Sequence, residues 1–415
     1  MTTQWNFRYA HRIQAIRSSA IRELLKLTQN AEMISFAGGM PAPELFPVEE
    51  FKAACDRVLS KQGQAALQYS TTEGYAPLRE LIAGIMARDG VKVKPENILI
   101  TASSQQALDL VAKLLINRGE HVLVESPTYL GAMQAFNVFG PEYLPVDTDD
   151  QGLCPEVLET VLPAGPKFMY VLPNFHNPAG ITLSLERRRK IVKLADTWGV
   201  PIVEDDPYGQ LRYEGESLPP LITLDARQLG TADDYRQGNV IYLSTFSKTL
   251  APGLRLGWIA APPDVTAKLG QLKQGADLHT STFTQMVAYE VARDGFLEHH
   301  VQKIRKVYGE RRNVMLDALE EYLPSEVTWT HPAGGLFLWV RLPQGMNCHD
   351  LFETAVKQNV AFVPGDSFFA APNGESSRYL RLNFSYMPPN MIVEGIRRIG
   401  VAVKEKMKNA YRESR

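Results

Sequence analysis

The chain of 415 residues carries a formal net charge of −2, with 45% hydrophobic and 22% charged residues, which is typical of an ordinary globular protein. A length of this order predicts roughly two or three domains, and a net charge near zero gives no general attraction to nucleic acid or anionic lipid. No apolar run approaches the length of a membrane span, so we expect neither nucleic acid nor membrane among the partners.

The N-terminus, MTTQWNFRYAHR, has no apolar region of the kind found in secretory signals. The three cysteines, Cys55, Cys154 and Cys348, lie far apart without metal-binding spacing. This usage suits a reducing compartment. We therefore expect a cytoplasmic protein with no structural metal.

Short apolar runs alternate with amphipathic helical patterns through the first part of the chain. The helical patterns cover Gln105–Asn117 and Leu185–Trp198, and the apolar runs predict buried strands. This alternation predicts an α/β layer with a largely parallel sheet. The predicted strands are Ile98–Thr101, His121–Val124, Phe168–Leu172, Pro201–Val203, Val240–Leu243 and Leu256–Ile259.

The pattern changes near Phe296. A long helical stretch runs to Tyr322, and runs with strand character follow at Gly335–Val340 and Tyr379–Phe384. These elements predict a second, smaller α+β unit. We expect a large α/β domain over residues 61–300, and a smaller one formed by an N-terminal arm, residues 1–60, together with residues 301–415.

Polar side chains follow the predicted strands at their carboxyl ends, where sites form in sheets of this kind. After Thr101 comes Ser103-Ser104-Gln105 at the start of a helix. Hydroxyls and free N–H groups in this position bind anions such as phosphate, and they also form plain helix caps. Tyr129 follows another strand, where it is either a core residue or an aromatic face of the site.

Three acidic residues, Glu204, Asp205 and Asp206, follow a further strand and precede Tyr208. They are consistent with a solvated loop, with ligands for a hard cation, or with a carboxylate that holds a protonated ring nitrogen. The segment around Asn177 is either an ordinary turn or a source of amides for the site.

Lys248 stands directly after the apolar run that ends at Leu243. A charged ammonium there is unfavourable unless it is paired, neutral or covalently attached. The phosphate cradle, aromatic ring, amide, carboxylate and lysine all fall at equivalent strand ends. Together they suit a phosphorylated pyridine aldehyde.

Several longer motifs occur in order along nearly the whole chain. On these motifs the sequence resembles the fold type I, class I/II aminotransferases that use pyridoxal 5'-phosphate, and among them the 2-aminoadipate (LysN-type) and kynurenine/aminoadipate aminotransferases. The motifs are SFAGGMPAPELFP (35–47), LQYSTTEGYAPLRE (67–80), ITASSQQALDL (100–110), PNFHNPAG (173–180), VEDDPYGQL (203–211), STFSKTLAPGLRLGW (244–258) and LRLNFS (380–385).

The resemblance implies a large domain with a mostly parallel seven-stranded sheet sandwiched by helices, and a smaller α+β domain. It implies that Lys248 carries the cofactor as a Schiff base and moves the substrate proton. Asp205 would keep the pyridine nitrogen protonated. Tyr208 and Asn177 would bind the ring hydroxyl, and Tyr129 would stack on the ring.

The resemblance also assigns a phosphate site to the strand ends. Two positions depart from the family pattern, because Ser103 stands where glycine is frequent and Thr245 where serine is frequent. A serine is unfavourable at Ser103 if the turn needs a positive φ. The implied phosphate ligands are Ser103, Ser104, Gln105, Thr245, Ser247 and Arg255.

For the substrate, the resemblance assigns the α-carboxylate to Arg381, supported by Asn177 and the backbone near Gly39. Arg22, with Ser19 adjacent, would meet a distal carboxylate; the alternative is a surface arginine on an amphipathic helix. Tyr69 would reach the site of a neighbouring subunit, which implies a homodimer with shared active sites; the alternative is a core tyrosine.

The implied activity is transfer of an amino group from an L-amino acid to a 2-oxo acid such as 2-oxoglutarate. Implied donors are 2-aminoadipate, glutamate, and aromatic or branched amino acids, with a place in amino acid metabolism such as lysine biosynthesis. Two other hypotheses are a carbon–sulfur β-lyase with the same cofactor and a ligand-sensing module. About 30 residues precede SFAGG, too few for a winged helix, so we expect no direct DNA binding.

Overall fold

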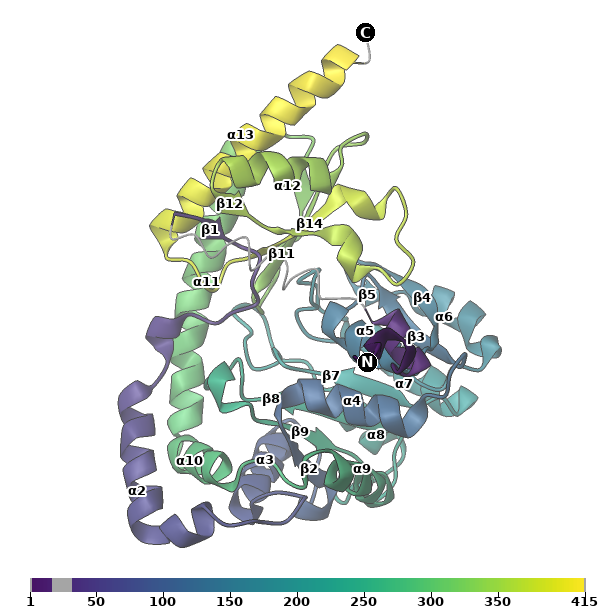
Figure 1. Cartoon of the computed structure of the whole chain (residues 1–415), viewed down its shortest axis with the longest axis vertical. Coiled ribbons are helices and arrows are strands. Elements are labelled where there is room, and N and C mark those ends of the chain that lie inside the picture. Colours follow the sequence, from purple (N-terminus) through teal and green to yellow (C-terminus); the bar gives the residue numbers. More distant parts are fainter. Residues whose placement is uncertain (1, 17–31, 414–415) are drawn as a thin grey trace.

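The computed structural model describes residues 2–16 and 32–413. Within these ranges the chain forms an eight-stranded sheet flanked by helices and a smaller unit built on a four-stranded sheet (Figure 1). None of the described helices is both long and apolar enough to cross a lipid bilayer.

The large sheet is mostly parallel, as the sequence predicts. Only β9 and β5 run against their neighbours. The sheet has eight strands rather than seven because β5, only two residues long, extends the edge beside β4. In spatial order the strands are β2 (Ile98–Thr101), β9 (Gly257–Ala260), β8 (Val240–Thr245), β7 (Ile202–Asp205), β6 (Met169–Val171), β3 (His121–Ser126), β4 (Glu142–Asp149) and β5 (Gly152–Leu153).

Successive residues of each strand point to opposite faces of the sheet, and both faces are covered. Leu123 and Ile202 pack in the core on one face, whereas Val122 and Val203 pack in the core on the other. The first face is covered by α3 (Ala76–Arg88), α6 (Pro155–Val161), α7 (Leu185–Trp198), α8 (Leu221–Gln228) and α10 (Thr282–Ala292), and the second by α4 (Ser103–Leu115), α5 (Leu130–Phe136) and α9 (Pro263–Asp277).

The smaller unit contains an antiparallel sheet in the order β10 (Thr328–Trp329), β11 (Phe337–Arg341), β14 (Tyr379–Asn383) and β13 (Val363–Pro364). An N-terminal strand, β1 (Ile34–Ser35), pairs with β12 (Val360–Ala361). The helices α12 (Cys348–Lys357) and α13 (Pro389–Glu413) complete the unit.

One long helix contributes to both cores. In α11 (Phe296–Tyr322), Leu297 and Val301 pack in the core of the large sheet, and residues from Ile304 onward pack in the core of the smaller unit. In α2 (Val48–Ala66), Ala54 and Val58 also pack in the large core. The two units therefore share one continuous helix at about residue 300.

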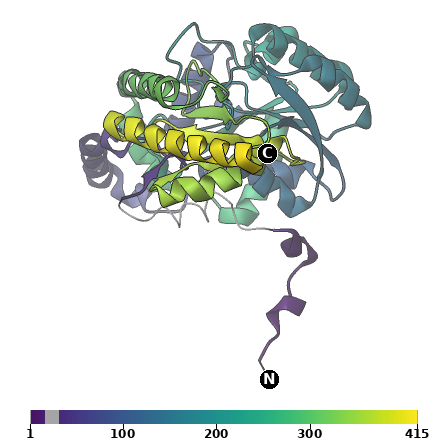
Figure 2. The same cartoon turned by 90° about the horizontal axis from the view of Figure 1, so that it is seen from above.

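The N-terminal arm, residues 2–16, leaves the body of the molecule (Figure 2). It contains η1 (Trp5–Phe7) and η2 (His11–Ala15). The side chains of Trp5 and Phe7 are 64% and 84% exposed. The remaining 3-10 turns are η3 (Pro43–Leu45), η4 (Pro95–Asn97), η5 (Asn137–Phe139), η6 (Leu162–Ala164), η7 (Pro252–Leu254), η8 (Gly365–Phe368) and η9 (Ser376–Arg378).

Candidate active site

A cavity of about 310 Å³ lies at the carboxyl ends of the strands of the large sheet, where β11 and β14 of the smaller unit face it. Nearly all of the sequence-predicted site residues that the structure describes line this cavity. They are Gly39, Ser103, Ser104, Gln105, Tyr129, Asn177, Asp205, Tyr208, Thr245, Ser247, Lys248, Arg255 and Arg381.

Tyr69 is the described exception. Its side chain is 78% exposed, it does not line the cavity, and its ring centre lies 5.9 Å from that of His279 with the two planes at 87°. It is therefore not a core residue of its own chain. The other two predicted residues, Arg22 and Ser19, lie outside the described residues.

Lys248 lies just beyond β8, and its Nζ donates a hydrogen bond of 2.7 Å to the carbonyl oxygen of Gly39. Burial, together with the charges of Arg381 and Arg255, lowers the pKa of Lys248 to about 8. Lys248 has no carboxylate partner among the described residues. A fraction of the amine is therefore neutral near pH 8, and a neutral amine is a nucleophile and a base.

Asp205 ends β7 and is 2% exposed. Its Oδ2 accepts a hydrogen bond of 2.6 Å from the hydroxyl of Tyr170, and its Oδ1 is buried without a hydrogen-bond partner. Burial raises the pKa of Asp205 to about 7, Tyr170 opposes this shift, and Asp206 adds to it. The unpaired oxygen lies at a cavity wall and is suited to a cationic N–H group.

The two acidic neighbours of Asp205 point elsewhere. Glu204 accepts hydrogen bonds from the first backbone N–H groups of α8, those of Leu221 and Ile222, at 2.7 and 2.9 Å. Asp206 accepts hydrogen bonds from Gly209 N at 2.8 Å and from the hydroxyl of Tyr242 at 3.3 Å. The three acids are thus neither a solvated loop nor one cluster of cation ligands.

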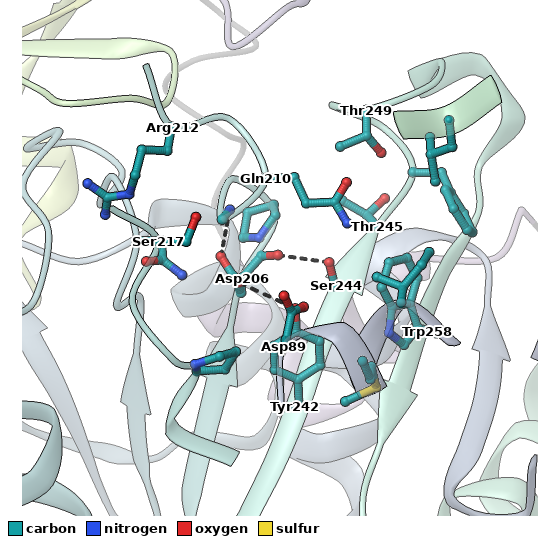
Figure 3. Close-up of a pocket in the computed structure, with 18 of the residues that line it drawn as sticks. Asp89, Asp206, Gln210, Arg212, Ser217, Tyr242, Ser244, Thr245, Thr249 and Trp258 are labelled. Atoms are coloured by element: carbon teal, nitrogen blue, oxygen red, sulfur yellow. Dashed lines mark hydrogen bonds between the residues drawn. The ribbon is translucent and has the colours of Figure 1, made fainter. Parts of the chain in front are cut away.

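Asp206 faces a second, smaller cavity of about 90 Å³ (Figure 3). This cavity shares Pro207 and Thr245 with the first, and Lys248, Asp205 and Arg381 do not line it. Its wall includes Asp89. Because successive side chains along an extended chain point in opposite directions, Asp205 and Asp206 line different cavities.

Arg381 lies on β14 and is 1% exposed. Its Nη1 donates to Asn177 Oδ1 at 2.8 Å and its Nη2 to the carbonyl oxygen of Ala37 at 2.7 Å, while Nε has no partner. The guanidinium carbon lies 4.2 Å from the ring centre of Phe337 and 5.0 Å from that of Phe368. Burial lowers the pKa of Arg381 to about 10, so the group stays charged at neutral pH.

Asn177 contacts two other residues that line the cavity, Arg381 and Tyr208. Besides accepting the hydrogen bond from Arg381, its side chain forms a hydrogen bond with Tyr208. Tyr208 is 4% exposed, and burial raises its pKa. The Asn177 amide therefore holds both the Arg381 guanidinium and the Tyr208 hydroxyl, so Asn177 is more than an ordinary turn residue.

The N-terminus of α4 forms one corner of the cavity. Ser103 has φ of 72°, so the turn does need the positive φ at which serine is unfavourable, and a non-glycine residue there is strained by about 1–2 kcal/mol. A Cβ on Gly257 of β9 would lie 2.7 Å from Ser104 N. Only glycine thus lets β9 approach α4 closely enough to aim the first free N–H groups at the cavity.

Hydroxyl groups and an arginine face the same corner. The Thr245 hydroxyl donates to the carbonyl oxygen of Leu256 at 2.8 Å, and its oxygen lies 2.9 Å from Ser247 Oγ. Threonine therefore still offers a hydroxyl where serine is frequent in the family. Arg255 stands at the rim with φ of 50°. Gln105 donates its amide to the carbonyl oxygen of Gly131 at 3.0 Å, which leaves its backbone N–H and Oε1 for a ligand.

The sequence analysis did not identify three residues that shape the site. Phe337 and Phe368 enclose Arg381, and Tyr170 bonds Asp205. All three belong to apolar runs that are typical of core packing, so no local signal distinguishes them. Strand pairing brings Phe337 to the cavity wall and Tyr170 beside Asp205, whereas Phe368 lies on η8 beside Arg381.

The fold and this arrangement of lysine, carboxylate, phenol and helix N-terminus define a transferase of fold type I. The family Aminotransferase class I and II matches residues 32–399. The chain belongs to this family, which confirms the resemblance seen in the sequence and the expectation of an aminotransferase.

Individual relatives agree with this placement. A 2-aminoadipate transaminase from Thermus thermophilus is 45% identical over 401 residues, which cover 96% of this chain and 97% of the relative. Aromatic-amino-acid aminotransferase 1 from Thermococcus litoralis is 44% identical over 407 residues, 96% of this chain and 95% of the relative.

A solved structure is similar over the whole fold. LysN, an α-aminoadipate aminotransferase from Thermus thermophilus complexed with N-(5'-phosphopyridoxyl)-L-leucine, has a TM-score of 0.90 and 43% identity, covering 98% of this chain and 100% of that chain. The family and this adduct indicate pyridoxal 5'-phosphate as the cofactor, as the sequence analysis expects.

Proposed function

We propose that the protein transfers the amino group of an L-amino acid to a 2-oxo acid, with pyridoxal 5'-phosphate held in the cavity of Lys248. The observation that carries this proposal is the juxtaposition of the Lys248 amine, the unpaired Oδ1 of Asp205 and the Arg381 guanidinium around one cavity. The residues fit the cofactor, because each of its polar groups finds a complementary group. The cavity volume of about 310 Å³ is also within the range of small-molecule sites.

The cofactor site would be held as follows. The N–H groups of Ser103, Ser104 and Gln105, with Ser247 and Arg255, would bind the phosphate. Thr245 holds Ser247 in place through its hydroxyl. Tyr129 would cover one face of the ring.

Asp205 would hold the ring nitrogen, and Tyr208 with Asn177 the ring hydroxyl. A pyridinium next to Asp205 satisfies Oδ1 and offsets the desolvation that raises the pKa of this carboxyl. When bound, the cofactor supplies an electron sink for the electron pair left when the substrate Cα loses its proton.

Arg381 would bind the substrate α-carboxylate through the donors that Asn177 and Ala37 leave free. The rings of Phe337 and Phe368 keep water from the guanidinium and fix its plane. This clamp orients the substrate so that its Cα–H lies toward Lys248.

Lys248 would carry the cofactor covalently at rest and is freed when the substrate amine takes its place. Its Nζ would then take the proton from Cα and return it to the cofactor carbon. A pKa of about 8 suits both steps at neutral pH. The second half of the cycle, with a 2-oxo acid, runs the same proton transfers in reverse.

The donor range follows from the distal end of the site, and we propose 2-aminoadipate, glutamate and aromatic amino acids, with 2-oxoglutarate as acceptor. Relatives named for 2-aminoadipate and for aromatic amino acids support a broad range. Arg22, with Ser19, is proposed to pair with a distal carboxylate. A role in lysine biosynthesis is proposed on the same basis.

A panel of amino donors with 2-oxoglutarate tests this function. We expect product with acidic and aromatic donors, and about a tenfold or greater loss of kcat/KM for acidic donors only in Arg22→Ala, because the proposed charge pair with the distal carboxylate is removed. Arg22→Lys is the matched control and should retain part of the preference. Equal losses for both donor classes would contradict charge pairing, and ammonia release from cystathionine without an acceptor would indicate a β-lyase instead.

We also propose a homodimer in which Tyr69 enters the partner's site. The motif that carries Tyr69 is exposed at Leu67 and Tyr69, which are 74% and 78% accessible. The apolar side chains of the N-terminal arm are exposed as well. Such a surface is unusual for a monomer.

Complementation tests the shared site. Tyr69→Ala and Lys248→Ala should each be inactive alone, and their mixture, after subunit exchange, should regain about a quarter of wild-type activity because hybrid dimers contain one intact site. A mixture of Lys248→Ala with Asp205→Asn is the control and should stay inactive, because both residues serve the site of their own chain. Light scattering that detects an active monomer would contradict the proposal.

A further inference from the structure

We propose that Tyr170 is a positioning residue that orients the Asp205 carboxylate so that Oδ1 faces the ring nitrogen of the cofactor. The proposal rests on the proposed function, because it assumes that pyridoxal phosphate occupies the cavity. It adds a residue from the interior of a strand to a site otherwise built at strand ends.

Strand pairing places the two residues on the same face of the sheet. β6 and β7 are parallel neighbours, with Tyr170 opposite Val203. Asp205 lies two residues beyond Val203 and therefore on the same face. Side chains in strands lean along the chain direction, so the long phenol reaches the carboxylate one pleat further on, where the two oxygens lie 2.6 Å apart.

Packing fixes the phenol in this orientation. Tyr170 is fully buried, and the edge of the Phe136 ring meets it with centroids 5.6 Å apart and planes at 85°. A carboxylate that ends a strand can otherwise rotate about its side-chain bonds. The hydrogen bond from Tyr170 to Oδ2 removes this freedom and leaves Oδ1 as the free oxygen.

The bond also sets the charge of the carboxylate. The other titratable groups that interact with Asp205 are Asp206, Tyr129 and Tyr208. Asp206 raises the pKa of Asp205, and only the hydrogen bond from Tyr170 lowers it. Without that bond the carboxylate would be more basic, and a shared proton would move from the ring nitrogen to Asp205.

The test compares Tyr170→Phe with the wild-type holoenzyme. The variant removes one oxygen and keeps the ring. With cofactor labelled by ¹⁵N at the ring nitrogen, we expect the ¹⁵N shift at pH 7.5 to move toward the neutral-ring value, and kcat to fall roughly 5–20-fold, as for the loss of one hydrogen bond to a charged group. Incorporation of 3-fluorotyrosine at 170 makes the phenol a stronger donor and should move the ¹⁵N shift in the opposite direction.

Tyr235→Phe is a matched control. Tyr235 is also a fully buried tyrosine, and its hydroxyl donates to Asp225 Oδ2 at 2.9 Å, but it does not line the cavity. This variant should lose stability as Tyr170→Phe does, while the ¹⁵N shift and kcat stay at wild-type values. Similar changes in both variants would show that Tyr170 acts only through general stability.

The loss of kcat in Tyr170→Phe should also depend on the presence of the Asp205 carboxylate. In an Asp205→Asn background, Tyr170→Phe should change kcat less than twofold, because a residue that acts through another is not additive with it. Wild-type ¹⁵N shifts with both phenylalanine and fluorotyrosine at 170 would overturn the positioning role. A wild-type protein that binds no labelled cofactor would instead overturn the proposed function, so the two failures are distinguishable.

Discussion

Lys248→Ala is expected to lose amino transfer by roughly 10⁴-fold or more, because one side chain serves both as the covalent carrier and as the proton carrier. The amine has no carboxylate partner in the described part of the chain, and its pKa is lowered to about 8. Among the described residues no other lysine lines the cavity, so none of them replaces it. Steady-state turnover with glutamate and a 2-oxo acid measures the loss.

Borohydride reduction followed by peptide mapping gives an independent measurement. Label should appear on the wild-type peptide that contains Lys248 and be absent from the variant. Lys273→Ala is the control, since Lys273 is fully buried but is paired with Asp277 at 2.7 Å on α9. It should retain the label and turnover. Normal turnover by Lys248→Ala would refute the assignment of this lysine.

Asp205→Asn is expected to retain the cofactor and lose roughly 10²–10³-fold in kcat, since a neutral amide does not stabilise a protonated ring nitrogen. The amide keeps the shape of the side chain, so the phosphate and ring contacts persist. Absorbance of the bound cofactor measures its retention, and kcat measures the loss.

Asp206→Asn is the control for Asp205→Asn, because it changes the adjacent carboxylate in the same way. Asp206 has the same chemistry and is similarly buried, at 7% exposed, but it lines the smaller cavity (Figure 3). Its change should reduce stability and leave kcat within about threefold of wild type. An unchanged rate in Asp205→Asn, or an equal loss in Asp206→Asn, would contradict the role given to Asp205.

Much of the fold is predictable because local signals agree with packing. Helix α7 begins and ends where the sequence predicts, since Ser184 caps it through its side chain and Gly199 ends it with φ of 62°. The strand at Gly257–Ala260 is also predicted within one residue. Its antiparallel direction is not, because direction depends on the route of the connection and not on residue pattern.

The site, like the fold, contains some features that local sequence predicts and others that depend on long-range pairing. The family motifs assign roles to Lys248, Arg381 and Asp205. Residue type alone does not distinguish Asp205 from Glu204, and strand register and the start of α8 give the physical reason for their different surroundings. Tyr170 is indistinguishable from a core residue until β6 lies beside β7. Long-range pairing therefore determines what local pattern leaves undecided.

The enclosure of Arg381 has a consequence for catalysis in salt solutions. Its guanidinium is held by two neutral oxygens and two rings, and no carboxylate of the described residues pairs with it. This unpaired positive charge attracts negatively charged solutes, an attraction that weakens with ionic strength. Chloride, sulfate and other small anions are accordingly natural competitors for the place that the amino acid carboxylate takes.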